Sequence, residues 1–230
     1  MATPPQRLDT ELLSLRRAVR HAFTRLAVGQ RKWIALSAKG KEVLTACANS
    51  QTSLERLDSA VWPMALDVGA VNRSCAIRVL RSRSMAQHEF AAVKAGLLEA
   101  VRGMQQAVVE LEAQVTNSKA RNAPLAFNES GVALLSRAQC IASAFEHELM
   151  VRSAVGLEVA EGCRECSIQP GWDASLRLYL AAWMLEPCLD LDIIQTTIDL
   201  MSGDEIQQIP SCSPRSMSLS TTGSAGALAS

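Results

Sequence analysis

The sequence predicts an all-α protein, an antiparallel helical bundle with a long coiled-coil-like helix and a disordered C-terminal tail. Three observations favour it. Aromatic residues make up only 4% of the 230 residues, while Leu, Ala, Val and Glu are abundant, which favours helices over strands. Apolar residues recur at intervals of three and four, and cap or breaker residues stand at each predicted junction. The length suits one globular core better than two large domains.

One helical domain is expected over residues 8–203, after a disordered start at residues 1–7. Its N-terminal part, residues 8–83, is predicted to consist of basic helices. Thr10 can cap the first of them, because its hydroxyl accepts a hydrogen bond from a free backbone N–H. Gly29 is predicted to end this helix.

A second helix is predicted over residues 32–60, weakened in its middle by Gly40. Trp62-Pro63 ends it, because proline lacks a backbone donor and restricts the residue before it. Residues 64–83 are predicted to form a third, more basic helix.

The clearest pattern is a long amphipathic helix over residues 88–119, the coiled-coil-like arm. Apolar residues step along it by three or four without interruption: Phe90, Val93, Leu97, Val101, Met104, Val108, Leu111 and Val115. Two consecutive four-residue steps make it a poor strict heptad. The stripe therefore favours the core of a bundle over an intermolecular zipper.

The C-terminal region, residues 129–203, is predicted to hold three helices, over residues 129–160, 173–185 and 190–201. Pro187 ends the second of them, and Asp190 and Asp192 favour the positive N-terminal end of the third. Residues 207–230 are rich in Ser and nearly free of charge, so they are predicted to be a disordered tail.

The net charge is zero but unevenly distributed. Residues 1–85 carry 14 Lys and Arg against 6 Asp and Glu, and residues 86–230 carry 9 against 17. The favoured interpretation is that the two halves pack together and neutralise each other. The alternative is a basic face for nucleic acid or an acidic partner, built from Arg16, Arg17, Arg20, Arg25, Arg73, Arg78, Arg81 and Arg83. No aromatic residues alternate with these arginines, which disfavours stacking on single strands.

The sequence gives little support for catalysis, and the protein is predicted not to be an enzyme. His21, His88 and His147 each stand alone on a predicted helix, and no phosphate-binding loop or nucleophile motif is present. Cys163 and Cys166 have the spacing of half a zinc site, but tetrahedral zinc needs two further ligands. No metal and no cofactor are therefore predicted, and a zinc site remains the weakest alternative.

Paired charges are likewise interpreted as structural. Glu146 and Glu148 point in different directions on a helix, which does not suit acid–base chemistry. Glu148 and Arg152 stand four residues apart, the spacing of an ion pair within one helix. The pair is expected at the surface or in a groove.

Two C-terminal segments resemble the cyclin-dependent kinase 2-interacting protein family. The first is Phe145–Ala160, where an aromatic residue precedes Glu-Leu, two aliphatic residues and a base. The second, Leu178–Asp190, is similar to the family pattern Tyr-Leu-x-x-Trp-x-x-x-Pro, which matches at Tyr179, Leu180, Trp183 and Pro187. The resemblance covers about 60 residues well. The basic segment 64–83 and the Ser-rich tail have no counterpart in the family.

The resemblance implies a non-enzymatic adaptor in the nucleus, and also in the cytoplasm. Its implied partners are cell-cycle kinases, subunits of an AAA+ ATPase complex and a second helical adaptor, with roles in DNA replication, checkpoint signalling and ribosome biogenesis. The long stripe supplies a surface for such a partner. The predicted partner-binding residues are Tyr179, Leu180, Trp183, Pro187, Phe145, Leu149, Val93, Leu97, Met104 and Leu111. A basic helical nucleic-acid-binding protein is the alternative.

The cellular compartment is predicted from cysteine usage and hydropathy. Seven scattered cysteines fit a reducing compartment. No stretch reaches the length and hydropathy of a membrane span, and the N-terminus lacks the apolar core of a signal peptide. A soluble intracellular protein without a membrane partner is expected.

Overall fold

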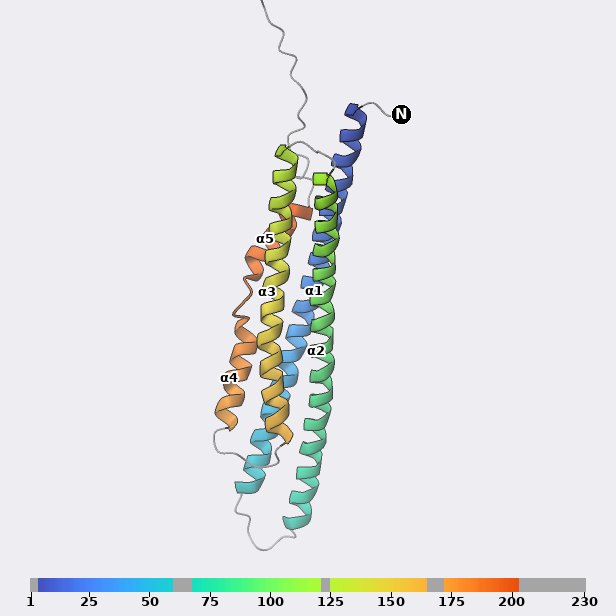
Figure 1. The fold of residues 1–230 in the computed structure, drawn as a ribbon. Coiled ribbons are helices and arrows are strands. Elements are labelled where there is room, and N and C mark those ends of the chain that lie inside the picture. Colours follow the sequence, from blue (N-terminus) through green and yellow to red (C-terminus); the bar gives the residue numbers. More distant parts are fainter. Residues whose placement is uncertain (1–3, 60–67, 121–124, 165–171, 203–230) are drawn as a thin grey trace, which may run out of the picture.

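The computed structural model describes residues 4–59, 68–120, 125–164 and 172–202, and these residues contain five helices and no strand. Three helices are long and two are short: α1 (Pro4–Ser59), α2 (Val68–Ala120), α3 (Leu125–Arg164), α4 (Trp172–Leu185) and α5 (Leu191–Ser202). The three long helices run down, up and down beside one another, and α4 and α5 together form a fourth, divided rod (Figure 1). The predicted all-α bundle is confirmed.

The first helix is longer than predicted at both ends. It begins at Pro4, so residues 4–7, predicted to be disordered, are helical. Proline suits the first helical turn because the N–H groups there have no partner within the helix. It also continues through Gly29 to Ser59, so the predicted stop was wrong. A Cβ atom at Gly29 would lie 2.6 Å from Cγ of Met104, which shows that this glycine lets α1 and α2 approach closely.

Helix α2 joins two segments that the sequence analysis predicted as separate helices. Residues 64–83 and 88–119 were predicted as two helices, but α2 is continuous from Val68 to Ala120. The eight apolar residues of the predicted stripe are all buried, from Leu97 at 0% exposed to Val108 at 8%. The stripe therefore forms the centre of the bundle, where α1 and α3 pack against α2.

The remaining helices agree closely with prediction. α3 extends the predicted helix by four residues at each end, α4 differs from prediction by one residue, and α5 ends at Ser202. Asp190 caps α5, because its Oδ1 accepts a hydrogen bond of 3.1 Å from the backbone N–H of Ile193. The predicted break at Trp62-Pro63 and the predicted disordered tail at residues 207–230 lie outside the described residues.

The core contains two aromatic pairs. Trp33 meets Phe145 edge-on at 5.3 Å between ring centroids, which joins α1 to α3. Phe90 meets Trp183 at 5.3 Å, which joins α2 to α4. Such pairs stabilise a core beyond the area that they bury. Among the helices described, none combines the length and hydropathy of a membrane span.

Gly40 provides a test of the packing between α1 and α4. A Cβ atom at Gly40 would collide with Cζ2 of the Trp183 indole, whereas a Cβ at the exposed Gly103 would meet nothing within 4 Å. We expect Gly40→Ala to lower the free energy of unfolding by about 1–3 kcal/mol, because the buried indole must move. Gly103→Ala should raise it by about 0.5–1 kcal/mol, because alanine favours the helix. Urea unfolding measures both, and equal effects would contradict the close contact.

Candidate functional site: the Arg152 cluster and the outer face of α4 and α5

A buried ion cluster lies where α1, α3 and α4 meet. Arg152 of α3 is 1% exposed and Glu148, one turn earlier, is 0% exposed. The Arg152 Nε donates to Glu148 Oε1 at 3.0 Å, and its Nη2 donates to Glu186 Oε1 at 2.5 Å. The Glu148–Arg152 ion pair was predicted, but its expected place at the surface or in a groove was wrong. Periodicity on α3 alone does not show that α4 covers this face.

The guanidinium of Arg152 uses its remaining donors on two other elements. Its Nη1 donates to Ser37 Oγ on α1 at 2.6 Å, and its Nη2 also points at the backbone oxygen of Trp183 at 3.4 Å. The Arg152 Cζ lies 4.9 Å from the ring centroid of Trp33 and 4.4 Å from that of Trp183. A guanidinium this close to two indole rings gains cation–π attraction from each of them. Arg152 therefore contacts α1 and α4 through one side chain.

The cluster also includes the turn after α4, because Glu148 binds this turn and Glu186 belongs to it. The second oxygen of Glu148, Oε2, accepts a hydrogen bond of 3.1 Å from the backbone N–H of Cys188. Glu186 has a φ of 45°, in the left-handed region that non-glycine residues rarely occupy. It also precedes Pro187, and the backbone N–H of Leu189 donates to its carbonyl at 2.9 Å. The ion pair with Arg152 holds Glu186 in this unusual conformation.

Trp183 completes the attachment of α4. It is 2% exposed, and its Nε1 donates to the backbone oxygen of Ser37 at 3.1 Å. That carbonyl belongs to α1, so one indole links α4 to α1 by a hydrogen bond and to α2 by its contact with Phe90. The sequence analysis named Trp183 but missed Trp33 and Ser37 as its partners in the cluster. The sequence feature that could have revealed the cluster was the charged pair of Glu148 and Arg152, because the positions around it on the helix are largely apolar.

The outer face of α4 and α5 exposes large apolar side chains. They project on the side away from the cluster and are between 48% and 76% exposed: Leu178, Met184, Leu185, Ile193 and Leu200. From Leu178 to Ser202 the chain carries four acidic residues and no basic one. We call these five side chains, with the exposed Asp192 and Asp199 beside them, the outer face.

A shallow hollow of about 550 Å³ lies between α3 and the turn after α4. Cys140, His147 and Cys188 line it together with small and polar residues. Burial raises the pKa of the Cys188 thiol, and the nearby Glu148 carboxylate raises it further. Within the part of the chain that the structure describes, no three His, Cys, Asp or Glu residues are grouped to hold a metal ion. Cys166 and the Cys163 side chain lie outside that part.

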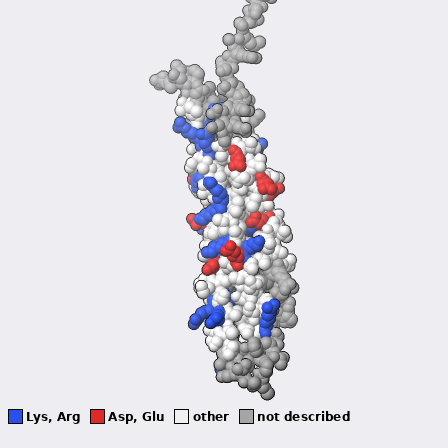
Figure 2. Space-filling model, turned by 180° about the vertical axis from the view of Figure 1, so that it is seen from behind, with Lys and Arg blue, Asp and Glu red and all other residues white. Residues whose placement is uncertain are grey.

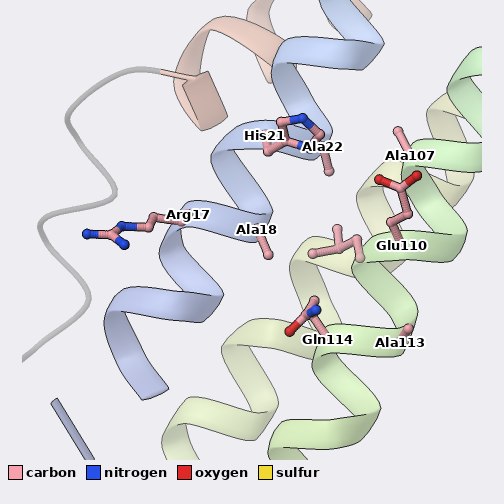
Figure 3. A pocket seen from close by; sticks show the side chains of 9 residues that line it. Arg17, Ala18, His21, Ala22, Ala107, Glu110, Ala113 and Gln114 are labelled. Atoms are coloured by element: carbon pink, nitrogen blue, oxygen red, sulfur yellow. The ribbon is translucent and has the colours of Figure 1, made fainter. Parts of the chain in front are cut away.

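A second hollow, of about 630 Å³, runs between α1 and α2 (Figure 3). Four of its nine lining residues are alanines: Ala18, Ala22, Ala107 and Ala113. The guanidinium of Arg17 points away from it in Figure 3. At its rim Arg25 and Glu110 form an ion pair of 2.6 Å, and the hydrogen bond from Arg25 lowers the pKa of Glu110. Glu110, a charged residue that lines this hollow beside the alanines, is thus already paired with Arg25.

The predicted partner-binding residues of the long stripe lie inside the bundle. Each is at most 2% exposed: Val93, Leu97, Met104 and Leu111. In this arrangement they contact the protein's own core. Binding of a partner through them stays a prediction, and it requires the bundle to open.

The predicted residues of the C-terminal signature are divided between interior and surface. Phe145 and Trp183 are buried, and Pro187 is exposed in the turn. The others are half-buried against the core: Leu149, Tyr179 and Leu180. The structure thus brings Phe145 and Trp183 into the core around Arg152. Phe145 contacts Trp33, and Trp183 contacts the Arg152 guanidinium. Their role towards a partner stays a prediction.

The predicted basic face is only partly present. Arg83 is buried and donates to Gln51 Oε1 at 3.3 Å, and Arg25 is paired with Glu110. Arg17, Arg78 and Arg81 are exposed. Lys32 of α1 also pairs with Glu99 of α2 at 2.8 Å. Some opposite charges of the two halves of the sequence therefore neutralise each other between α1 and α2, as expected.

The chain matches no protein-family model, no curated protein and no solved structure. The class of protein that the fold defines is an all-α bundle whose fourth rod is divided at Pro187. The resemblance to the cyclin-dependent kinase 2-interacting protein family continues to depend on the two quoted segments alone.

Removal of the Arg152 side chain should destabilise the whole bundle. In Arg152→Ala the Glu148 carboxylate stays buried without its cation, so we expect the free energy of unfolding to fall by about 3–5 kcal/mol. Arg137→Ala is the matched control, because Arg137 is an exposed arginine on the same helix. Its effect should stay within about 0.5 kcal/mol. Similar melting temperatures for the two variants would contradict a structural role of the cluster.

The raised pKa of Cys188 predicts slow alkylation. The thiolate is the reactive form, so a raised pKa lowers the reactive fraction at any pH below it. Cys188 and Cys75 are both exposed. At pH 8 we expect iodoacetamide to modify Cys188 more slowly than Cys75, with the difference shrinking as the pH rises. Peptide mass spectrometry measures both rates in one sample. Equal rates in urea are the control, and equal rates in the folded protein at pH 8 would contradict the prediction.

Proposed function

We propose that this chain is a non-enzymatic adaptor that presents the outer face of α4 and α5 to a partner protein. The observation that carries the proposal is the combination of a rigidly attached layer with apolar side chains turned outwards. Leu178 and Leu185 stand seven residues apart on α4, and Ile193 and Leu200 stand seven apart on α5. This spacing is that of the anchors by which helices bind one another.

The attachment of the layer supports the proposal. α4 has 14 residues and α5 has 12, too few to be stable alone. Arg152, Trp183 and Glu186 hold them against the bundle, so the outer face is preorganised before a partner arrives. Preorganisation lowers the entropy lost on binding.

The buried charges favour an adaptor over an enzyme. Arg152 is surrounded by two carboxylates, a hydroxyl and two indoles, and Glu148 binds both the arginine and a backbone N–H. Each group already has protein partners, which leaves none directed at a substrate. A buried network with this many internal partners stabilises a fold.

The finer assignment is based on the family resemblance. It assigns the chain to a nuclear assembly that contains an AAA+ ATPase and a second helical adaptor, in contact with cell-cycle kinases. DNA replication, checkpoint signalling and ribosome biogenesis are the processes that it implies. The signature residues Tyr179, Leu180, Trp183 and Pro187 are its support.

The test compares two double variants of the full chain in quantitative affinity purification. Leu185→Glu with Ile193→Glu places charges on the outer face and should reduce one set of co-purified proteins by about tenfold or more, as at a binding hot spot. Val28→Glu with Val109→Glu is the control, because both valines are exposed on α1 and α2. Both variants should melt like the wild type. Unchanged partners in the first variant would refute the proposed face, and recovery of an AAA+ subunit would support the finer assignment.

A further inference from the structure

The first six turns of α2 carry a second exposed stripe, on the side opposite the core. Its members are separated by three or four residues in strict alternation, and all are exposed: Val71, Ser74, Arg78, Arg81, Met85 and His88. Ile77, 56% exposed, lies beside them. The buried side of the same turns holds Arg83, Ala86 and Phe90. Strict alternation of three and four is the pattern that a coiled-coil partner requires, so we call these six residues the α2 stripe.

The α2 stripe is basic. Residues 68–87 contain four arginines and no acidic residue. One of the four, Arg83, points inwards to Gln51, whereas Arg78 and Arg81 point outwards and make no ion pair with any residue that the structure describes. Among the described residues on the face shown in Figure 2, acidic side chains lie higher up and basic ones reach further towards the lower end, where α2 begins.

The α2 stripe also carries two exposed apolar side chains, one on either side of its two arginines. Val71 is 58% exposed and Met85 is 65% exposed. They stand seven residues before and after Arg78, so the two arginines lie between two apolar side chains. Exposed apolar side chains in register with unpaired charges indicate a protein partner, since phosphate contacts need only the charges.

We propose that the α2 stripe binds an acidic amphipathic helix of a partner protein. Such a helix would place two carboxylates opposite Arg78 and Arg81 and apolar side chains opposite Val71 and Met85. Arginine suits this role because its planar fork binds a carboxylate through two hydrogen bonds. Val71 and Met85, with the apolar side chains opposite them, would exclude water from the ion pairs, and this exclusion strengthens the ion pairs.

This surface is distinct from the outer face of α4 and α5. The outer face carries only acidic charges between Leu178 and Ser202, whereas the α2 stripe carries only basic ones. A single partner helix cannot be complementary in charge to both surfaces. The chain therefore has two docking surfaces of opposite charge, and the failure of one proposal leaves the other intact.

The test uses a fluorescein-labelled synthetic helix of 21 residues with leucines at the first and last stripe positions and glutamates at the middle two. Fluorescence anisotropy at low salt measures its dissociation constant for the full chain. Arg78→Glu with Arg81→Glu should weaken binding by about tenfold or more, as for close charge pairs. The control is Arg102→Glu with Arg137→Glu, two exposed arginines outside the α2 stripe, which should leave binding unchanged.

A charge-reversed peptide makes the test specific. With lysines in place of glutamates it should bind the Arg78→Glu, Arg81→Glu variant more tightly than it binds the wild type, which shows that the variant is folded. No binding of the acidic peptide by the wild type would overturn the proposal, as would equal binding by both double variants. Tighter binding of duplex DNA, or of vesicles containing phosphatidylserine, with loss in the same variant, would assign the α2 stripe to those ligands instead.

Discussion

The fold depends on one cation buried between two indoles. Arg152 lies between Trp33 of α1 and Trp183 of α4, and its charge is balanced by Glu148 and Glu186. Burial of an ion is costly unless its hydrogen bonds and charge are satisfied, so the cluster forms only when all three elements are in place. This requirement couples the last two helices to the long bundle. It also selects one register of α4, because the carboxylate of Glu186 must reach the guanidinium.

The cluster determines which surface the chain offers to other molecules. The divided fourth rod is interrupted at Pro187, and Glu186 just before it takes the left-handed conformation. With Trp183 facing inwards, the opposite side of α4 and α5 faces outwards with its apolar and acidic residues. The basic start of α2 lies elsewhere on the molecule (Figure 1). Two features therefore contribute to the net charge of zero. Ion pairs between α1 and α2 neutralise charges within the bundle, and two surfaces of opposite charge balance each other.

Local patterns in the sequence were sufficient for most of the fold. The apolar stripe within residues 88–119 predicted the centre of the bundle, because a period of three and four places one face towards a neighbour. Asp190 predicted the start of α5 and Pro187 the end of α4, because caps and breakers act within a single turn. These features depend on residues close together in the chain.

The tertiary structure alone decided what distant residues do to one another. Gly29 and Gly40 were expected to end or weaken a helix, but each lies where a Met104 or Trp183 side chain crosses α1 at close range. The Glu148–Arg152 spacing predicted an ion pair, but one at the surface or in a groove. Its complete burial requires the indole and carboxylate of α4, about thirty residues further on, to cover that face of α3. Sequence periodicity determines which side of a helix is apolar, and only packing determines which charges that side encloses.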